Sequence, residues 1–74
     1  GEAAPWPDGR AARAAAVRAA LVAFGRPATA AEVAGTFAGP ANRARLAAVG
    51  ELLPTLVALG QARAAGEGRF VAGS

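Results

Sequence analysis

The chain of 74 residues contains no cysteine and no histidine. Structural zinc, catalytic zinc and iron–sulfur clusters depend on thiolate or imidazole ligands, so these sites are excluded. Nucleophilic catalysis by a serine–histidine or cysteine–histidine pair is excluded on the same ground. We therefore expect the chain to hold no metal and no cofactor.

Lysine is also absent, and carboxylates are few and scattered. The five acidic residues lie far apart along the chain, at Glu2, Asp8, Glu32, Glu51 and Glu67. No pair has a spacing that predicts a shared catalytic site, and no glycine-rich motif ending in lysine is present to cradle phosphate. A chain this short has little room for an enclosed substrate pocket. We expect a non-catalytic domain without a small-molecule ligand.

The sequence has no apolar run of membrane-spanning length. Arg18 and Arg26 bracket the longest N-terminal apolar stretch, so we expect no membrane span. A basic segment followed by an apolar one is missing at the N-terminus, which predicts no signal peptide and a cytoplasmic protein. Because the sequence begins with Gly1 and not with Met, we expect it to be part of a longer protein.

What the sequence does contain is alanine and arginine. Hydrophobic residues make up 54% of the chain, but alanine alone accounts for about a third of it, so the list of large core residues is short. All eight positive charges are arginine, and the net charge is +3. This balance is compatible with nucleic-acid binding, although it is modest for a dedicated nucleic-acid-binding domain.

The N-terminal third predicts a tether and a helix. Residues 1–7 contain Pro5-Trp6-Pro7, which favours an extended tether, and residues 8–74 form the predicted domain. We expect Trp6 to fold back and bury its indole rather than act as a free binding residue. Asp8 is expected to cap a helix that ends at Gly25. The buried stripe of this helix comprises Ala14, Val17, Leu21 and Phe24.

A capping box gives the sharpest local signal of the chain. Residues 26–28 are expected to be extended because of Pro27, and they could supply a short strand. Thr29-Ala30-Ala31-Glu32 then has the Ser/Thr-x-x-Glu pattern that opens a helix. This short second helix is expected to carry Val33, Ala34 and Phe37 on one side, and Gly39-Pro40 is expected to end it.

A longer third helix is predicted from Ala41 to Leu59. Its buried stripe has a period of 3.6 residues and comprises Leu46, Val49, Leu53 and Leu56, flanked by Leu52 and Val57. Pro54 cannot donate a hydrogen bond to the carbonyl of Gly50, so we expect one kinked helix, with two shorter helices as the alternative.

The last segment predicts a β-hairpin. Residues 61–65 and 69–72 form its strands, and Gly66-Glu67-Gly68 forms its turn. Phe70 is expected to pack on the helices, with Arg69 and Val71 on the other face of the strand. The alternative is a three-helix bundle with a disordered tail.

These elements predict a mainly α domain with a small β-hairpin, of the α+β class. Three stretches, RPATAAEVAGTF, RARLAAVGELLPTLVALGQAR and GEGRFVA, resemble the winged helix–turn–helix family over residues 10–72. LLPTLVALGQAR together with GRFVA is also similar to winged-helix modules at the C-termini of large bacterial DNA methylases and restriction–modification proteins.

The resemblance implies an accessory DNA-binding module of such an enzyme. It assigns the third helix to the DNA major groove, with its first turn at Ala41, Asn42, Arg43 and Arg45. Asparagine can read adenine, and arginine can read guanine or hold a phosphate. Arg69 and Arg63 of the wing would contact phosphates. The implied partner is double-stranded DNA, bound weakly and mainly through its phosphates.

A different function is suggested by the face of the third helix opposite its apolar stripe. That face comprises Ala44, Ala47, Ala48, Glu51, Thr55 and Ala58, and it has no positive charge beyond the first turn. It is better suited to packing against another protein than to a phosphate backbone. The alternative function is therefore dimerisation or docking onto other domains of the parent protein, with no DNA contact.

Overall fold

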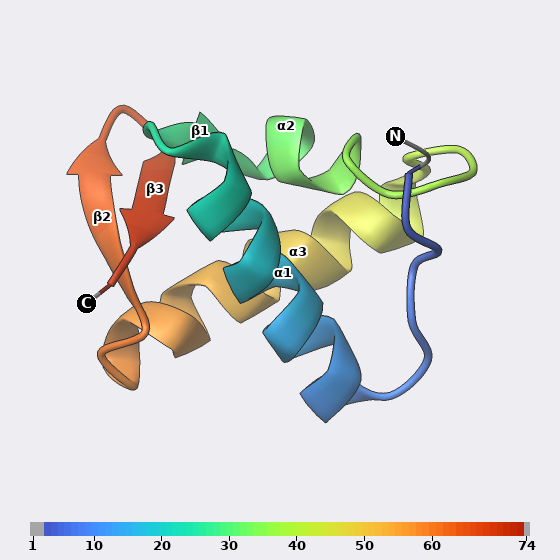
Figure 1. The fold of residues 1–74 in the computed structure, drawn as a ribbon, viewed down its shortest axis with the longest axis horizontal. Helices are drawn as coiled ribbons and strands as arrows, with labels where there is room; N and C mark the ends of the chain where they lie inside the picture. The colour runs from blue at the N-terminus through green and yellow to red at the C-terminus, as the bar shows by residue number, and fades with distance from the viewer. Residues whose placement is uncertain (1–2, 74) are drawn as a thin grey trace.

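Three helices and a three-stranded antiparallel sheet make up residues 3–73, the part of the chain that the computed structural model describes. The elements are α1 (Arg10–Phe24), β1 (Ala28–Thr29), α2 (Ala30–Ala34), α3 (Arg43–Ala58), β2 (Ala62–Gly66) and β3 (Arg69–Ala72) (Figure 1). The strand order in the sheet is β1-β3-β2. This is a winged-helix-like α+β topology, as predicted. Among residues 3–73, none of the helices combines the length and the apolar composition that a membrane span requires.

The C-terminal hairpin forms as predicted and is joined by β1. Phe70 of β3 lies between Ala28 of β1 and Ala64 of β2 in the register of the sheet. Glu67 and Gly68 both have positive φ, 55° and 72°, which are the signs that a two-residue type I′ turn requires. Phe70 is half-buried and packs against the core, as expected. The alternative with a disordered tail is therefore wrong.

The core lies where α3 meets α1, α2 and the start of β2. In Figure 1, α1 crosses in front of α3, while the hairpin stands at the far end of α3 from the N-terminal segment. The fully buried large side chains are Val17, Leu21, Val33, Val49, Leu53 and Leu56. All six belong to the stripes expected from the sequence. Ala34 and Phe37 are buried as well, which confirms the predicted apolar side of the second helical segment.

The prediction that Leu46 belongs to the buried stripe of α3 is wrong. Leu46 is 41% exposed, whereas its neighbour Arg45 is only 9% exposed. The guanidinium of Arg45 is enclosed by carbonyl groups of the connection between α2 and α3. Leu46 lies one residue further and 100° around the helix, on the exposed side. The same helix continues without a break through Pro54, which excludes the alternative of two shorter helices.

Two helix ends also differ from the expectation. The N-cap of α1 is Gly9 and not Asp8, because Gly9 adopts a φ of 87° that places the Asp8 side chain outside the cap. Asp8 instead lies 3.9 Å from Arg13. The second helix ends at Ala34, with Gly35 as its C-cap, so Phe37 lies in the turn that follows it. Gly39-Pro40 belongs to the longer connection to α3 and does not end α2.

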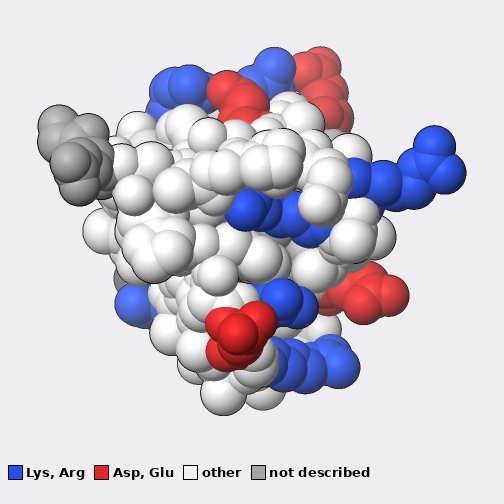
Figure 2. Space-filling model, turned by 90° about the vertical axis from the view of Figure 1, so that its right-hand side faces the viewer, with Lys and Arg blue, Asp and Glu red and all other residues white. Residues whose placement is uncertain are grey.

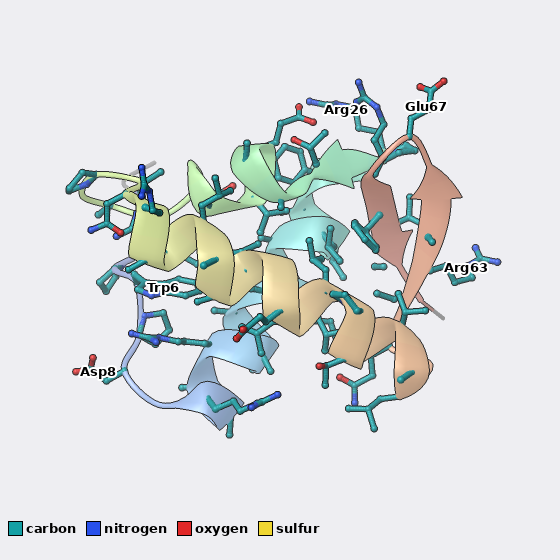
Figure 3. All side chains as sticks on the ribbon, turned by 180° about the vertical axis from the view of Figure 1, so that it is seen from behind. Trp6, Asp8, Arg26, Arg63 and Glu67 are labelled. Carbon is teal, nitrogen blue, oxygen red and sulfur yellow. The ribbon has the colours of Figure 1, made fainter. Side chains whose placement is uncertain are left out.

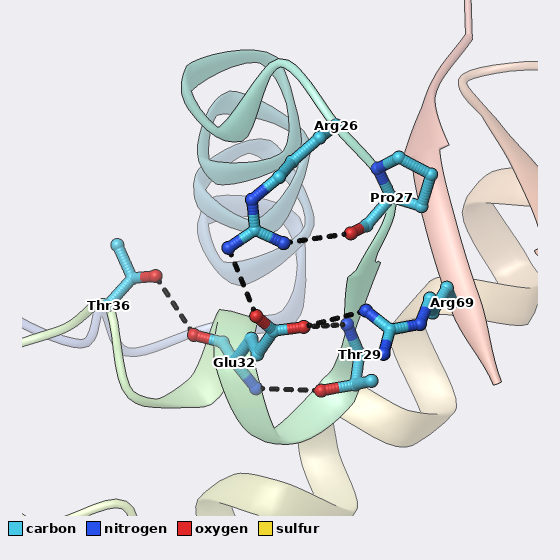
Figure 4. Close-up of polar contacts among 6 residues, drawn as sticks. All are labelled: Arg26, Pro27, Thr29, Glu32, Thr36 and Arg69. Atoms are coloured by element: carbon cyan, nitrogen blue, oxygen red, sulfur yellow. Dashed lines mark hydrogen bonds and ion pairs between the residues drawn. The ribbon is translucent and has the colours of Figure 1, made fainter.

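Glu32 joins three parts of the fold (Figure 4). The predicted capping box is confirmed: Glu32 N donates to Thr29 Oγ1 at 3.1 Å, and Thr29 N donates to Glu32 Oε1 at 3.0 Å. The same carboxylate lies 3.2 Å from Arg26 and 3.6 Å from Arg69 of β3. The hydrogen bond from Thr29 N, followed by the contact with Arg26, holds the pKa of Glu32 below its ordinary value of 4.5.

Replacing Glu32 by glutamine should therefore change how stability depends on pH. A lowered pKa in the folded state adds stability above the ordinary pKa of 4.5, and this stability is lost as the pH falls through the lowered value. Glutamine retains the cap hydrogen bonds but not the charge. We expect Glu32→Gln to have a lower melting temperature than the parent at neutral pH, and the difference to shrink in acid. Thermal melts across this pH range measure it.

Glu67→Gln is the matched control for this experiment, because it removes an exposed carboxylate at the hairpin turn. A melting-temperature difference for Glu32→Gln that stayed constant at all pH values, or that Glu67→Gln reproduced, would contradict the role given to Glu32.

Candidate nucleic-acid interface

The two places at which winged-helix domains contact DNA are the start of the recognition helix and the hairpin. Here each place has one arginine directed into solvent. Arg43 opens α3 and is exposed, and Arg63 of β2 is exposed and extends away from the hairpin (Figure 3). Among residues 3–73, neither guanidinium has a hydrogen-bond or ion-pair partner. Both are therefore available to an anion.

Asn42 is the N-cap of α3. Its Oδ1 accepts a hydrogen bond from the backbone N–H of Arg45 at 2.9 Å, and this contact ties the side chain to the first turn of the helix. Reading adenine requires both the oxygen and the amide nitrogen of asparagine. Asn42 could do so only by giving up the cap.

Arg45 faces inward and is hydrogen-bonded to the connection between α2 and α3. Its Nη2 donates to Ala38 O at 2.8 Å, and its Nη1 donates to Phe37 O at 3.2 Å and to Gly39 O at 3.3 Å. Gly39 has a φ of 85°, and a Cβ at this position would lie 3.4 Å from Arg45 Nη2. The guanidinium thus donates to three carbonyl groups of a connection that lies outside the helices and the sheet, so its charge stabilises the fold.

Trp6 closes over this arrangement from the N-terminal side. Its ring lies 4.9 Å from the Phe37 ring in an edge-to-face arrangement, and the guanidinium carbons of Arg45 and Arg13 lie 5.7 Å and 5.1 Å from its centroid. These are cation–π distances. Ala38 N also donates to Ala4 O at 2.8 Å, so the approach segment runs along the α2–α3 connection. The prediction that Trp6 folds back onto the body is confirmed.

The guanidinium of Arg69 is partly exposed to solvent and partly engaged with the carboxylate of Glu32. Its side chain is 44% exposed and 3.6 Å from Glu32. A phosphate would compete with this carboxylate for the guanidinium. Of the five residues predicted to contact DNA, the structure leaves Arg43 and Arg63 without an internal contact in the described segment, while Asn42, Arg45 and Arg69 each have one.

The outward face of α3 carries few groups that could read a base. After Arg43, the exposed positions of α3 are Ala44, Leu46, Ala47, Gly50, Glu51, Pro54 and Ala58. Gly50 lies in open space. Such a surface can approach another molecule closely, but among these side chains only the carboxylate of Glu51 can hydrogen-bond to a base edge.

Charges of both signs alternate on the face that includes the beginning of α3. Figure 2 views the right-hand side of Figure 1 and shows separate blue and red groups among white ones, without a continuous blue patch. An alternating surface produces a weaker attraction for a phosphate backbone than a single basic patch does.

The role of Arg45 was missed by the sequence analysis, which placed it on the surface. The one signal that could have indicated it is its spacing, since positions 45, 49, 52 and 56 match a helical period as well as positions 46, 49, 53 and 56 do. The pattern of polarity favoured leucine at the buried position. The partners that make a buried arginine favourable come from residues 6 and 37–39, and no local pattern connects them with residue 45.

Replacing Arg45 by lysine should destabilise the fold although it keeps the charge. Lysine has no planar fork to reach three carbonyl groups at once, and a hydrogen bond to a charged group contributes about 1.5–3 kcal/mol. We expect the free energy of unfolding to fall by about this amount. Urea denaturation, followed by the fluorescence of Trp6, the only tryptophan of the chain, measures it.

Arg43→Lys is the control, since it makes the same chemical change two residues earlier in the same helix, at an exposed site. Its effect should stay within about 0.5 kcal/mol. Equal losses in the two variants would mean that the buried contacts of Arg45 do not stabilise the fold.

Comparisons of the chain with models of protein families, with curated proteins and with solved structures found no match. The winged-helix-like description therefore depends on the architecture itself: three helices followed by a small antiparallel hairpin, with a short strand before α2 completing the sheet.

Proposed function

We propose that this chain is an accessory DNA-binding winged-helix module of a larger bacterial DNA-modifying protein, a methylase or a restriction–modification enzyme. The single observation that carries this proposal is the exposure of one arginine at each DNA-contacting place of the winged-helix arrangement, Arg43 and Arg63. The resemblance of LLPTLVALGQAR and GRFVA to the ends of such enzymes supports the identity of the parent protein.

The spacing of the two arginines suits two separate phosphate contacts. Arg43 begins α3 and Arg63 follows its far end, and the 16 residues of this helix, at 1.5 Å each, span about 24 Å. With a rise of 3.4 Å per nucleotide along a strand, this distance corresponds to roughly seven base pairs of duplex DNA. The two side chains would thus hold one duplex at two points.

The binding mode we propose is independent of base sequence. Asn42 and Arg45, which the resemblance assigns to base reading, are used in the helix cap and in the connection before it. The rest of the outward face of α3 offers little to recognise a base. A contact made mainly through phosphates positions a duplex without reading it, which is what an accessory module of a larger enzyme needs to do.

The dependence of DNA affinity on salt tests this footprint. Each phosphate contact adds about −0.9 to the slope of log K against log salt concentration, so two contacts predict a slope of about −1.8. Arg43→Ala and Arg63→Ala should each make the slope less negative by about 0.9, and the double variant should abolish most of the binding. Fluorescence anisotropy with a labelled short duplex at several salt concentrations measures these slopes, and duplexes of different sequence should bind equally.

Arg18→Ala is the matched control, because it removes an exposed arginine of α1 that lies in neither DNA-contacting place. Its slope should equal that of the parent. A double variant that binds as well as the parent, or a loss in Arg18→Ala as large as in Arg43→Ala, would overturn the proposal.

A further inference from the structure

A long trough runs between α1 and α3, away from the exposed arginines of α3 and the hairpin. It consists of three adjoining hollows. The first is lined by Trp6, Arg13 and the start of α3, and the second, of about 210 Å³, shares Arg13 with it. The third, of about 610 Å³, shares Arg10 and Leu52 with the second and reaches the end of α3. An open channel walled by two helices suits an elongated partner better than a small molecule, which needs enclosure.

The floor of the trough is apolar. The third hollow is lined by Ala11, Ala14 and Ala15 of α1 and by Leu52, Leu56 and Leu59 on the opposite side, together with Thr55 and Gln61. Leu59 is 65% exposed, the highest value among the large hydrophobic residues of the described segment. Short side chains on the α1 wall allow a helix backbone to approach closely, and an exposed leucine at one end gives that helix an apolar contact.

The rim of the trough is positively charged. Arg10, Arg13 and Arg18 stand on the α1 side, and Glu51 is the only acidic residue among the lining residues. Arg13 already donates a hydrogen bond to Pro7 O and lies near Asp8. Arg10 and Arg18 are exposed, and neither has an ion-pair partner among residues 3–73. They are eight residues apart on one helix, a distance of about 12 Å. Two carboxylates seven or eight residues apart on a partner helix match this spacing.

We propose that the trough between α1 and α3 is a docking site for an acidic amphipathic helix of another protein or of another domain of the parent protein. The apolar face of that helix packs onto the alanines and leucines of the floor, and its carboxylates pair with Arg10 and Arg18. A second copy of this chain is a poor occupant, because the trough of each copy would bring arginines against arginines. This function is independent of DNA binding through Arg43 and Arg63.

A pair of synthetic peptides tests the proposal. One is an amphipathic helix with leucines on one face and glutamates flanking them, and its twin has lysine in place of every glutamate. The glutamate peptide should shift the amide signals of Ala14, Ala15, Ala48 and Leu52 and bind the protein at least about tenfold more tightly than its twin, because charge pairs at the rim favour one and repel the other. The double variant Arg10→Glu/Arg18→Glu should reverse this preference.

Two further variants keep the test decisive. Ala15→Trp fills the trough at an exposed position without a change of charge and should weaken the glutamate peptide, whereas Arg63→Glu on the hairpin should leave it unaffected. Equal binding of the two peptides, signal shifts confined to residues that do not line the trough, self-association through this face, or duplex DNA that shifts the same signals and depends on Arg18 would each overturn the proposal. Loss of DNA binding in Arg43→Ala leaves it intact, so the two proposals fail separately.

Discussion

The fold depends on the hydrogen bonds that Arg45 donates to the backbone between α2 and α3, where no helix or strand is present. Residues 35–42 make up a long connection whose backbone carbonyls need partners, and the guanidinium of Arg45 supplies donors to three of them in succession. The same group lies against Trp6, which brings the N-terminal segment onto the body. One buried charge therefore connects α3, the loop before it and the segment before α1.

Features determined by neighbouring residues were predictable from the sequence. The capping box at Thr29 and Glu32, the left-handed glycine after α1 and the glycine-containing hairpin turn each depend on a few adjacent positions, and each is present in the structure. The hydrophobic periods of α1 and α3 indicated most of the core for the same reason. The exchange of Arg45 and Leu46 on α3 was not predictable in this way, because contacts with distant residues decide it.

The candidate interface was less predictable than the fold. Arginine at the start of a recognition helix or in a wing has the same appearance in a sequence whether it faces DNA or the protein. Only the folded chain shows that Arg69 shares the carboxylate of Glu32 and that Arg45 is enclosed, while Arg43 and Arg63 extend outward. Similarly, the trough between α1 and α3 arises from two segments some 40 positions apart, and each helix by itself shows only an alanine-rich side.

The hairpin turn limits the angle from which a polyanion could come near this domain. Glu67 sits at the tip, in a left-handed conformation, and Figure 3 shows its carboxylate directed outward beyond the strands. Repulsion at that point disfavours insertion of the tip into a groove of the double helix. A duplex would instead meet the flank of the hairpin along β2, where Arg63 lies. Under the proposed function, the hairpin would therefore contact a nucleic-acid backbone from the side and would not insert between its strands.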